Sequence, residues 1–374
     1  MRNCRGNRRL PSARAARSYV PLSEEPVSRN LVPLEDWIAR LPKVELHLHL
    51  EGALRPQTLI ELGWRNRTDA TELARWAGDL ERRNFRFGNF QAFVEAYKFV
   101  AGFLNSPADY ALAAERLVES LAAEKVRYAE VTLSAGMVLW KKQSLEAAFE
   151  AAAQAAADAG AKLDVRVNWI FDAIRHFGAE PAREVLRIAA RYRERGVVAF
   201  GIGGDERRGP ANLFVDLYRE ARDRGLHTTA HAGETMGPES VRAAVELLGA
   251  ERIGHGLRAA EDRAVLALVR DRGVPLEVCL TSNVATGAIA EASDHPLPTI
   301  LREGVRVTLN SDDPGLFGTS LEREFLLAAR TFDFSRKQLA GFIENAIDTA
   351  FLAEWEKSEL RMALEALTLG QGSA

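Results

Sequence analysis

The sequence predicts an α/β protein of the (β/α)8 TIM-barrel class, with extra helices after the first strand and at the C-terminus. From residue 44 onward, short β-rich runs alternate with helical stretches rich in Ala, Leu, Arg and Glu, and there are eight such runs. This alternation is typical of a parallel sheet. Polar residues capable of catalysis stand where several runs end, as they do in barrel enzymes. A single barrel of well over 200 residues fits a chain of 374 residues.

The expected elements follow in order. Strands are expected at 44–50, 126–134, 163–171, 197–203, 226–231, 251–255, 274–280 and 305–311. Helices are expected between most of them, at 145–159, 181–195, 213–224, 238–248 and 262–272, several of which end near a Gly. Residues 319–368 are expected to be helical only, and to cover the last strand and the barrel floor.

The segment 52–125 is far longer than a simple connection between two strands. Within it, NFRFGNFQAFVEAYKFVAGFL places Phe87, Phe90 and Phe93 at helical spacing. Two interpretations stay open. The segment is a lid over the barrel mouth, or it is an ordinary amphipathic helix packed on the barrel.

The composition of the chain limits which partners and which cellular location are expected. Residues 1–30 contain seven Arg against Glu24 and Glu25, although the net charge of the chain is −3. The rest is therefore mildly acidic, which argues against nucleic acid as a partner. No apolar run is long enough to span a membrane. Cys4 and Cys279 form no disulfide framework, and a reducing, cytoplasmic location is expected.

The basic leader lacks the apolar core of a secretory signal. We expect residues 1–32 to be a disordered tail, or to derive from a start codon upstream of the native one, and residues 33–374 to form one barrel domain. The sequence does not predict the oligomeric state.

The candidate site residues stand at the ends of the expected strands. Positions i and i+2 share one face of a strand, so His47 and His49 can bind one ion together. The carboxyl ends of barrel strands meet at one mouth, which would bring the polar residues of separate strands together. These residues are His47 and His49 (first strand), Gly203 and Gly204 (fourth), His231 and Glu234 (fifth), His255 (sixth), and Asp312 and Asp313 (eighth).

Each motif alone has a structural explanation. A strand histidine is often hydrogen-bonded in a core, and Asp312–Asp313 before Pro314 could be a helix cap or a turn. Their joint occurrence at strand ends favours a common site. The remaining histidines, His176, His227 and His295, are expected to be structural or exposed.

Three imidazoles and a carboxylate suit zinc, with one coordination position left for water. The expected ligands are His47, His49, His231 and Asp312, holding one Zn²⁺ per chain. Coordination lowers the pKa of the water toward neutrality and supplies hydroxide, so a hydrolytic reaction is expected.

Five motifs occur in a familiar order: KVELHLHLEG, VVAFGIGGDE, HAGETMGPESV, ERIGHG and LNSDDPGLFGTSLEREF. In these motifs, from residue 40 to the C-terminus, the chain resembles the adenosine deaminases of the metal-dependent amidohydrolase superfamily. The resemblance implies one zinc on the four ligands above. It also implies that Glu234 handles the purine N1 proton, His255 orients or deprotonates the water, Asp313 contacts N7, and the Gly204 backbone contacts N3.

The implied roles agree with the chemistry. Attack at C6 of an aminopurine breaks its aromaticity, so an acid at N1 must donate a proton as the tetrahedral carbon forms. Glu234 stands three residues after a metal ligand and is the candidate acid. His255 is the candidate for managing the water and the leaving ammonia.

Departures from the family pattern limit the prediction of the substrate. Glu51 stands where many adenosine deaminases have an Asp that contacts the ribose 5′ end, and the fourth strand reads FGIGGDE rather than IDLAGDE. HAGETMGPESV and EVCLTSNVATGAI are more similar to the aminodeoxyfutalosine deaminases of menaquinone synthesis, although HVHLVG, usual in those enzymes, is absent.

The expected reaction is deamination of a purine nucleoside, with adenosine, giving inosine and ammonia, as the first candidate. Aminodeoxyfutalosine and free adenine are the alternatives. His49, Glu51, Phe87 and Phe90 are expected to contact the substrate beside Gly204 and Asp313. A carboxylate at Glu51 would repel a 5′-phosphate, which disfavours AMP.

Other classes fit the residues less well. A binuclear amidohydrolase would carry a bridging Lys or Glu at the end of the fourth strand, and AFGIGG has neither. Deaminases with a His/Cys/Cys zinc site need a CxxC pair, which this chain lacks. A non-catalytic purine-binding protein on the same scaffold is the least favoured alternative.

Overall fold

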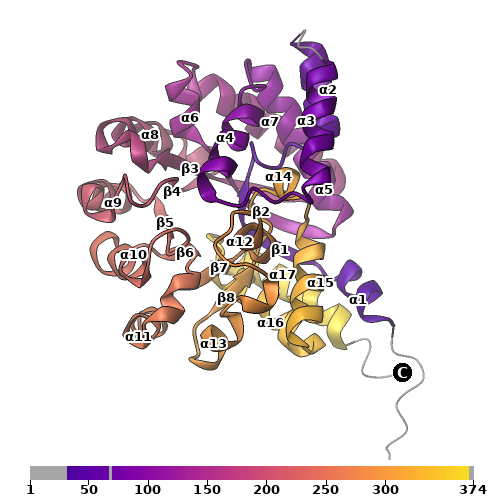
Figure 1. Cartoon of the computed structure of the whole chain (residues 1–374), viewed down its shortest axis with the longest axis vertical. Helices are drawn as coiled ribbons and strands as arrows, with labels where there is room; N and C mark the ends of the chain where they lie inside the picture. The colour runs from indigo at the N-terminus through magenta and orange to yellow at the C-terminus, as the bar shows by residue number, and fades with distance from the viewer. Residues whose placement is uncertain (1–31, 67–69, 370–374) are drawn as a thin grey trace, which may run out of the picture.

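The computed structural model describes residues 32–66 and 70–369. In this part of the chain, eight parallel strands form one sheet in the order β1 to β8. The backbones of His47, His49 and Asp312 exchange hydrogen bonds and so bring the end of β8 back to β1. The predicted (β/α)8 barrel is confirmed (Figure 1).

The bounds of the strands and helices are as follows. The strands are β1 (Lys43–His49), β2 (Val126–Leu133), β3 (Arg166–Ile174), β4 (Val197–Gly203), β5 (His227–Ala232), β6 (Arg252–His255), β7 (Leu276–Val278) and β8 (Val307–Leu309). The helices up to β4 are α1 (Leu34–Arg40), α2 (Pro56–Arg65), α3 (Ala70–Arg82), α4 (Phe90–Ala101), α5 (Pro107–Ala123), α6 (Ala135–Trp140), α7 (Leu145–Leu163) and α8 (Ala179–Arg191). After β4 follow α9 (Val215–Asp223), α10 (Pro238–Ala243), α11 (Arg263–Asp271), α12 (Leu280–Ala285), α13 (Leu297–Arg302), α14 (Pro314–Phe317), α15 (Leu321–Phe332), α16 (Arg336–Thr349) and α17 (Glu354–Leu369).

The third predicted strand was placed three residues too early. Ser144 caps α7 by accepting a hydrogen bond from the Ala147 N–H, and the helix continues to Leu163. It ends at Asp164, whose left-handed φ of 59° turns the chain. The strand therefore begins only at Arg166 instead of 163.

Two predicted helices also differ from the observed ones. The helix expected at 181–195 ends at Arg191, and a short 3-10 turn follows before β4. The helix expected at 238–248 is α-helical only to Ala243 and continues as a π turn over Ala244–Leu248. A π turn widens the helix by one residue per turn.

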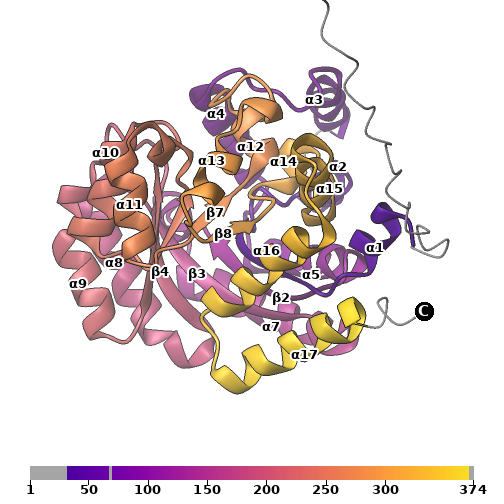
Figure 2. The same ribbon diagram turned by 90° about the horizontal axis from the view of Figure 1, so that it is seen from below.

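The long segment after β1 forms α2 to α5. Helices α3 and α4 lie at the same end of the barrel as α12 and α14 (Figure 2). The rings of Phe87, Phe93 and Phe317 pack on one another, which ties the aromatic segment to α14. This segment is therefore packed on the barrel at the end where the site lies.

The C-terminal region is helical, as predicted. Helix α16 packs against β8 and β1, and Asn345 donates a hydrogen bond to the Val307 carbonyl at 2.9 Å. Figure 2 shows α16 and α17 crossing one side of the barrel. The predicted tail, 1–32, lies outside the described residues except for Val32, whose carbonyl accepts a hydrogen bond from Arg336. None of the described helices combines the length and apolar character needed to cross a membrane.

Candidate metal centre and catalytic site

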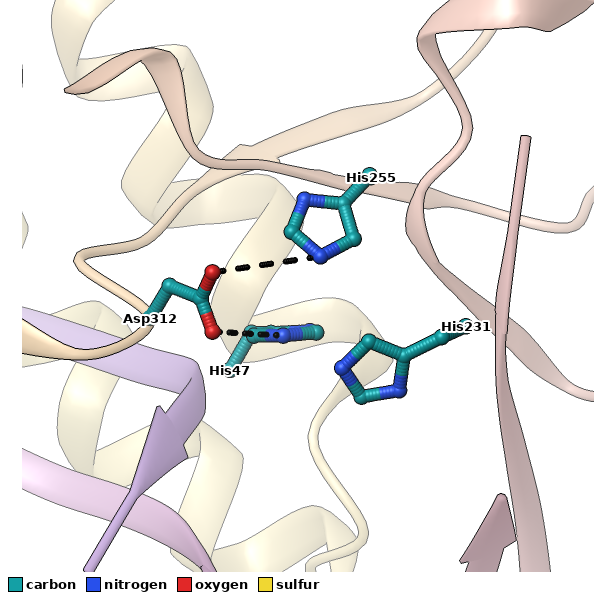
Figure 3. Close-up of side chains that lie close together, drawn as sticks. All are labelled: His47, His231, His255 and Asp312. Atoms are coloured by element: carbon teal, nitrogen blue, oxygen red, sulfur yellow. Dashed lines mark ion pairs between the residues drawn. The ribbon is translucent and has the colours of Figure 1, made fainter. Parts of the chain in front are cut away.

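Four side chains from four strand ends meet inside the barrel. One nitrogen or oxygen atom from each of His47, His231, His255 and Asp312 lies within 4.8 Å of all the others. Figure 3 shows Asp312 facing His47 and His255, with His231 beside them. His49, predicted as a ligand, lies against the same carboxylate, with Nε2 3.3 Å from Asp312 Oδ1. The structure thus brings together all four predicted metal ligands and adds His255.

A bulge in β1 positions His47. Glu45 pairs with Ala129 and Leu48 with Val131, so β1 carries one extra residue over this stretch. Such bulges redirect side chains near active sites. The freed N–H groups of Leu46 and His47 both donate to the Asn310 side-chain oxygen, at 3.0 and 3.2 Å. The buried amide of Asn310 therefore stabilises the bulge.

Two residues of the cluster have an unusual backbone. His255 and Asp312 have φ angles of 62° and 63°. Non-glycine residues rarely adopt this left-handed region, and where they do they often belong to functional sites. Both are almost completely buried. The surrounding fold therefore holds these two side chains in a conformation that costs free energy.

A buried carboxylate, Glu277, fixes the ring of His47 by a contact at Nδ1. Its Nδ1 lies 2.8 Å from Glu277 Oε2, and Glu277 Oε1 in turn accepts a hydrogen bond from Arg252 Nε at 2.6 Å. Arg252 also pairs with Glu130, and its guanidinium stacks on the Phe351 ring at 3.8 Å. Burial raises the pKa of Glu277, but Arg252 and His47 outweigh it and hold this pKa below its ordinary value. The ionised Glu277 carboxylate accepts a hydrogen bond from the N–H group at Nδ1 of His47.

The donor atoms fit a metal ion. Nε2 of His47 lies 3.3 Å from Asp312 Oδ1, and this buried nitrogen makes no hydrogen bond to the described residues. Burial lowers the pKa of His47, but Asp312 and Glu277 outweigh it and raise this pKa well above its ordinary value, so the position favours positive charge, which a metal cation could supply in place of the Nε2 proton. His231 Nδ1 lies 3.3 Å from the Ile202 carbonyl oxygen, which fixes its proton and leaves Nε2 free. Imidazole nitrogens and a carboxylate are the ligands of borderline divalent cations.

Burial and neighbouring charges shift the pKa values of the histidines and of Asp312 in the cluster. Burial lowers the pKa of His49 to about 4 and that of His255 to about 3. Burial also raises the pKa of Asp312, but the neighbouring histidines outweigh it and hold this pKa well below its ordinary value. Asp312 is therefore an anionic side chain, with the neutral rings of His49 and His255 and the more basic ring of His47 around it.

Two further carboxyl groups face the cluster in the opposite protonation state. Burial raises the pKa of Glu234 well above its ordinary value, and the nearby Asp312 and Glu206 charges add to this. The pKa of Asp313 is raised well above its ordinary value by the same causes, burial first and Asp312 second. Asp313 Oδ1 is buried without a hydrogen-bond partner among the described residues. A Cβ on Gly52 would lie only 1.6 Å from that atom, so Asp313 needs a glycine there.

Glu206 holds the loop that carries Glu234. Its carboxylate accepts hydrogen bonds from the backbone N–H groups of Gly233, Glu234 and Thr235 at 2.8 to 3.0 Å. A carboxylate that collects several backbone N–H groups fixes a loop in one conformation. Glu206 thereby positions Glu234 relative to His231.

The cluster opens into a cavity of about 640 Å³, including space open to solvent. Of the predicted site residues outside the metal ligands, Phe90, Gly204, Glu234, His255 and Asp313 line it, and so does His49. The apolar part of the wall comes from Phe90, Phe93, Val94, Met137 and Ile174.

Glu51 and Phe87 are not among the residues that line the cavity. Glu51 lies behind the wall, where it accepts hydrogen bonds from Tyr97 Oη at 3.1 Å and from the Ser134 N–H at 3.2 Å. Phe87 packs against Phe93 and Phe317. Both side chains support residues that face the cavity.

Several residues that lie in or behind the site were not predicted from the sequence: Asp172, Glu206, Glu277, Asn283 and Asn310. His176, which lines the cavity, and His295, which contacts Asn283, were expected to be structural or exposed. A signal existed for Glu277, because a charged residue within the apolar run VPLEVCL has to be paired when buried. Burial raises the pKa of Asp172 to about 8. For the other residues of this group, the neighbouring sequence does not indicate a role in the site.

A parallel eight-stranded barrel with histidines and carboxylates gathered at its strand ends defines the class of metal-dependent hydrolases of the amidohydrolase type. A family model described as adenosine deaminase matches residues 42–367. The chain belongs to the adenosine deaminase family. It is a hydrolytic deaminase, of the adenosine, adenine or aminodeoxyfutalosine type, that acts on a C–N bond.

Individual relatives agree with this assignment. The chain is 37% identical to an aminodeoxyfutalosine deaminase of Streptomyces avermitilis, over 90% of this chain and 93% of the relative. It is 33% identical to an adenosine deaminase of Mycobacterium ulcerans, over 88% and 95% of the two chains.

Solved structures show the same fold. An adenine deaminase from Arthrobacter aurescens superposes with a TM-score of 0.81 at 30% identity, over 89% of this chain and 100% of the other. An amidohydrolase from Burkholderia ambifaria with bound Zn superposes with a TM-score of 0.79 at 25% identity, over 93% and 98%. The predicted family resemblance is confirmed.

Proposed function

We propose that this protein is a zinc-dependent deaminase that replaces the 6-amino group of a purine nucleoside with oxygen and releases ammonia. One observation carries the proposal. Glu234, whose pKa is raised well above its ordinary value, and Asp312, whose pKa is lowered well below it, belong to the same cluster and line one cavity. Carboxyl groups held in opposite protonation states are typical of acid–base active sites.

His47, His49, His231 and Asp312 would hold the zinc. The lone pair of His47 Nε2 and the anionic Asp312 meet at this point, and the Burkholderia amidohydrolase contains Zn on the same fold. When bound, zinc would supply an activated water molecule at neutral pH. In this proposal His255 does not coordinate the zinc.

Glu234 would donate a proton to N1 of the purine. Burial raises the pKa of this carboxyl and so favours its protonated form, which a general acid requires. The six hydrogen bonds that Glu206 accepts from the loop 233–240 hold the acid in place. Attack at C6 breaks the aromaticity of the purine ring, and protonation of N1 offsets this cost.

Asp313 and Gly204 would recognise the purine edge. A protonated Asp313 carboxyl can donate to N7, and its Oδ1 is a buried polar atom without another partner in the described residues. Gly204 has φ +91°, and a Cβ there would lie 2.9 Å from His176 Nδ1, so this backbone position excludes other residues. The exposed backbone can then approach N3.

The candidate substrates differ in the group attached to N9 of the purine. Adenosine is the first candidate from the sequence. Aminodeoxyfutalosine, whose N9 substituent is larger than ribose, is favoured by the Streptomyces relative and by the apolar wall of Phe90, Val94, Met137 and Ile174. We propose a nucleoside rather than free adenine because these four side chains line the cavity in addition to the residues assigned to the purine.

An ammonia-release assay tests the proposal. The zinc-loaded protein is incubated with adenine, adenosine, 2′-deoxyadenosine, AMP and aminodeoxyfutalosine, and kcat/KM is compared. We expect one of the nucleosides to exceed both adenine and AMP. A faster reaction with adenine than with every nucleoside contradicts the nucleoside assignment, and ammonia from none of the five contradicts the proposed substrate class.

A further inference from the structure

His255 presents Nε2 to the centre of the site. This nitrogen lies 3.8 Å from Glu234 Oε2 and 3.9 Å from Asp312 Oδ2. The opposite ring nitrogen, Nδ1, lies 3.3 Å from Asn283 Nδ2. In a neutral imidazole one nitrogen carries the proton and the other a lone pair. The position of that proton decides whether His255 offers the site a hydrogen-bond donor or a potential metal ligand.

A backbone N–H group outside the site determines which ring nitrogen of a second histidine, His295, carries the proton. The N–H of Leu297, which can only donate, points to Nδ1 of His295 at 3.0 Å. Nδ1 of His295 must therefore accept, and the proton of the neutral ring is on Nε2. Burial lowers the pKa of His295 to about 4, so the ring is neutral at physiological pH.

The proton on His295 then orients the amide of Asn283. Nε2 of His295 lies 3.2 Å from Asn283 Oδ1, which accepts that proton in a hydrogen bond. The amide nitrogen of Asn283 consequently points away from His295 and toward Nδ1 of His255. An amide nitrogen only donates. Nδ1 of His255 is therefore an acceptor, and its proton is on Nε2.

We propose that Asn283 and His295 are positioning residues that fix the proton of His255 on Nε2, so that this histidine acts as a hydrogen-bond donor in the site and is not a metal ligand. His47 is the contrasting case. Its ring centroid is 5.0 Å from that of His255, yet Glu277 accepts from its Nδ1, so that in the neutral ring the lone pair is on Nε2. As neutral rings, the two neighbours are thus held as opposite tautomers.

The consequence for the reaction rests on the proposed function. With a proton already on Nε2, His255 can donate a hydrogen bond to the attacking water and orient its lone pair toward the substrate. It cannot take a proton at the same nitrogen without becoming cationic, which its burial disfavours. Of the two roles that the family resemblance implies, orientation of the water is the one this network supports.

Asn283 and His295 are both buried and hydrogen-bonded. Asn283 is completely buried on α12, directly after β7, and its backbone N–H donates to the Cys279 carbonyl at 3.1 Å. His295 is 3% exposed and precedes α13. Because both side chains are buried and hydrogen-bonded on each side, rotation of the amide would break two hydrogen bonds at once.

Asn283→Asp is the sharpest test. A carboxylate has no N–H, so it would accept from His295 Nε2 and from His255 Nδ1, and the His255 proton would move to Nδ1. The shape of the side chain hardly changes. We expect kcat to fall by ~10²-fold or more while KM and zinc content stay close to wild type, since the loss of a correctly placed proton is a catalytic defect. Asn345→Asp, a matched change at an amide that donates to the Val307 carbonyl and contacts none of the described site residues, is expected to retain kcat.

Nitrogen NMR of the zinc-loaded protein, labelled with ¹⁵N-histidine, reads the tautomer directly. The inference predicts a pyrrole-like Nε2 for His255 in the wild type and a pyridine-like Nε2 in Asn283→Asp. His295→Phe removes the group that orients the amide and is expected to give a mixture of the two forms, with an intermediate kcat.

The outcomes separate this inference from the proposed function. An unprotonated or zinc-bound Nε2 of His255 in the wild type overturns the tautomer assignment even if the enzyme is fully active. Unchanged kcat in Asn283→Asp overturns the positioning role. A wild-type protein that deaminates no purine contradicts the proposed function, and the NMR result then still supports or overturns the tautomer assignment.

Discussion

Nδ1 of His47 lies 2.8 Å from Oε2 of Glu277, and this contact determines which nitrogen of His47 faces the metal cluster. Glu277 reaches His47 from β7 across 230 residues of chain and is itself held by Arg252. Carboxylates that hold the second nitrogen of a ligating histidine fix its orientation and raise its basicity. The metal affinity of this site therefore depends on residues that do not contact the metal.

Glu277→Gln is expected to weaken metal binding. Glutamine has a single acceptor oxygen, and the charged Arg252 Nε–H will take it, so the NH2 group faces His47 Nδ1. The proton of His47 then moves to Nε2 and competes with the metal. We expect the zinc dissociation constant to rise ~10- to 100-fold, measured by competition with a chromogenic chelator.

Glu324→Gln is the control for that experiment. It also replaces a buried carboxyl, but Glu324 contacts Thr281 and Thr319 and none of the cluster residues. Its zinc affinity is expected to equal that of the wild type. Equal affinity in a folded Glu277→Gln protein would show that Glu277 does not orient His47.

His231→Ala is expected to remove the metal. His231 Nδ1 donates to the Ile202 carbonyl and its Nε2 is left for coordination. Loss of one ligand from a four-ligand set opens the site and abolishes tight binding. Metal analysis after gel filtration should find less than about a tenth of the wild-type content. Full metal content together with full activity would refute the proposed ligand set.

Glu234→Gln separates the acid from the metal site. Glutamine keeps the size of the side chain but has no acidic proton, so the fold and the zinc content are expected to stay unchanged. We expect kcat to fall by at least ~10²-fold, the lower end for general acid catalysis. Steady-state kinetics with zinc analysis checks this. Unchanged turnover would place the acid elsewhere.

The pH dependence of stability reports on Glu324. Burial raises the pKa of this carboxyl to about 7, although Thr281 and Thr319 donate to it. A raised carboxyl pKa means that the folded state favours the protonated form, so stability is highest below the unfolded pKa of about 4.5 and falls as pH rises through about 7.

Glu324→Gln mimics the protonated form and removes this loss. Between pH 5 and pH 8, the difference in the free energy of unfolding is expected to shift in favour of the variant by roughly 3 kcal/mol, the equivalent of the pKa shift. Urea unfolding at the two pH values measures it. A difference that is the same at both pH values would mean that Glu324 titrates normally in the folded protein.

The sequence predicted the barrel and the metal cluster because both depend on local patterns. Each strand is a short apolar run between helices, and His47, His231 and Asp312 stand at the ends of such runs. The barrel topology alone then brings them together. The bounds were least accurate where a cap decided them, as at Asp164, because a single left-handed residue leaves no periodic signal.

The residues behind the site could not be predicted because their roles depend on partners far along the chain. Asn310 supports the β1 bulge from the residue after β8, and His295, which was expected to be structural or exposed, is buried and contacts Asn283. Such contacts have neither a fixed spacing nor a characteristic composition. For the same reason the sequence could not show that Glu51 lies behind Tyr97 and Ser134 instead of lining the cavity.

Metal-dependent ammonia release tests the central claim most directly. The protein is stripped with a chelator, its zinc content is measured, and ammonia release from adenosine and aminodeoxyfutalosine is followed before and after zinc is added back. We predict about one zinc per chain in the active protein, loss of ammonia release on stripping, and recovery when one equivalent of zinc is restored. Undiminished ammonia release from the metal-free protein, or none from the zinc-loaded protein with either nucleoside, would contradict the account.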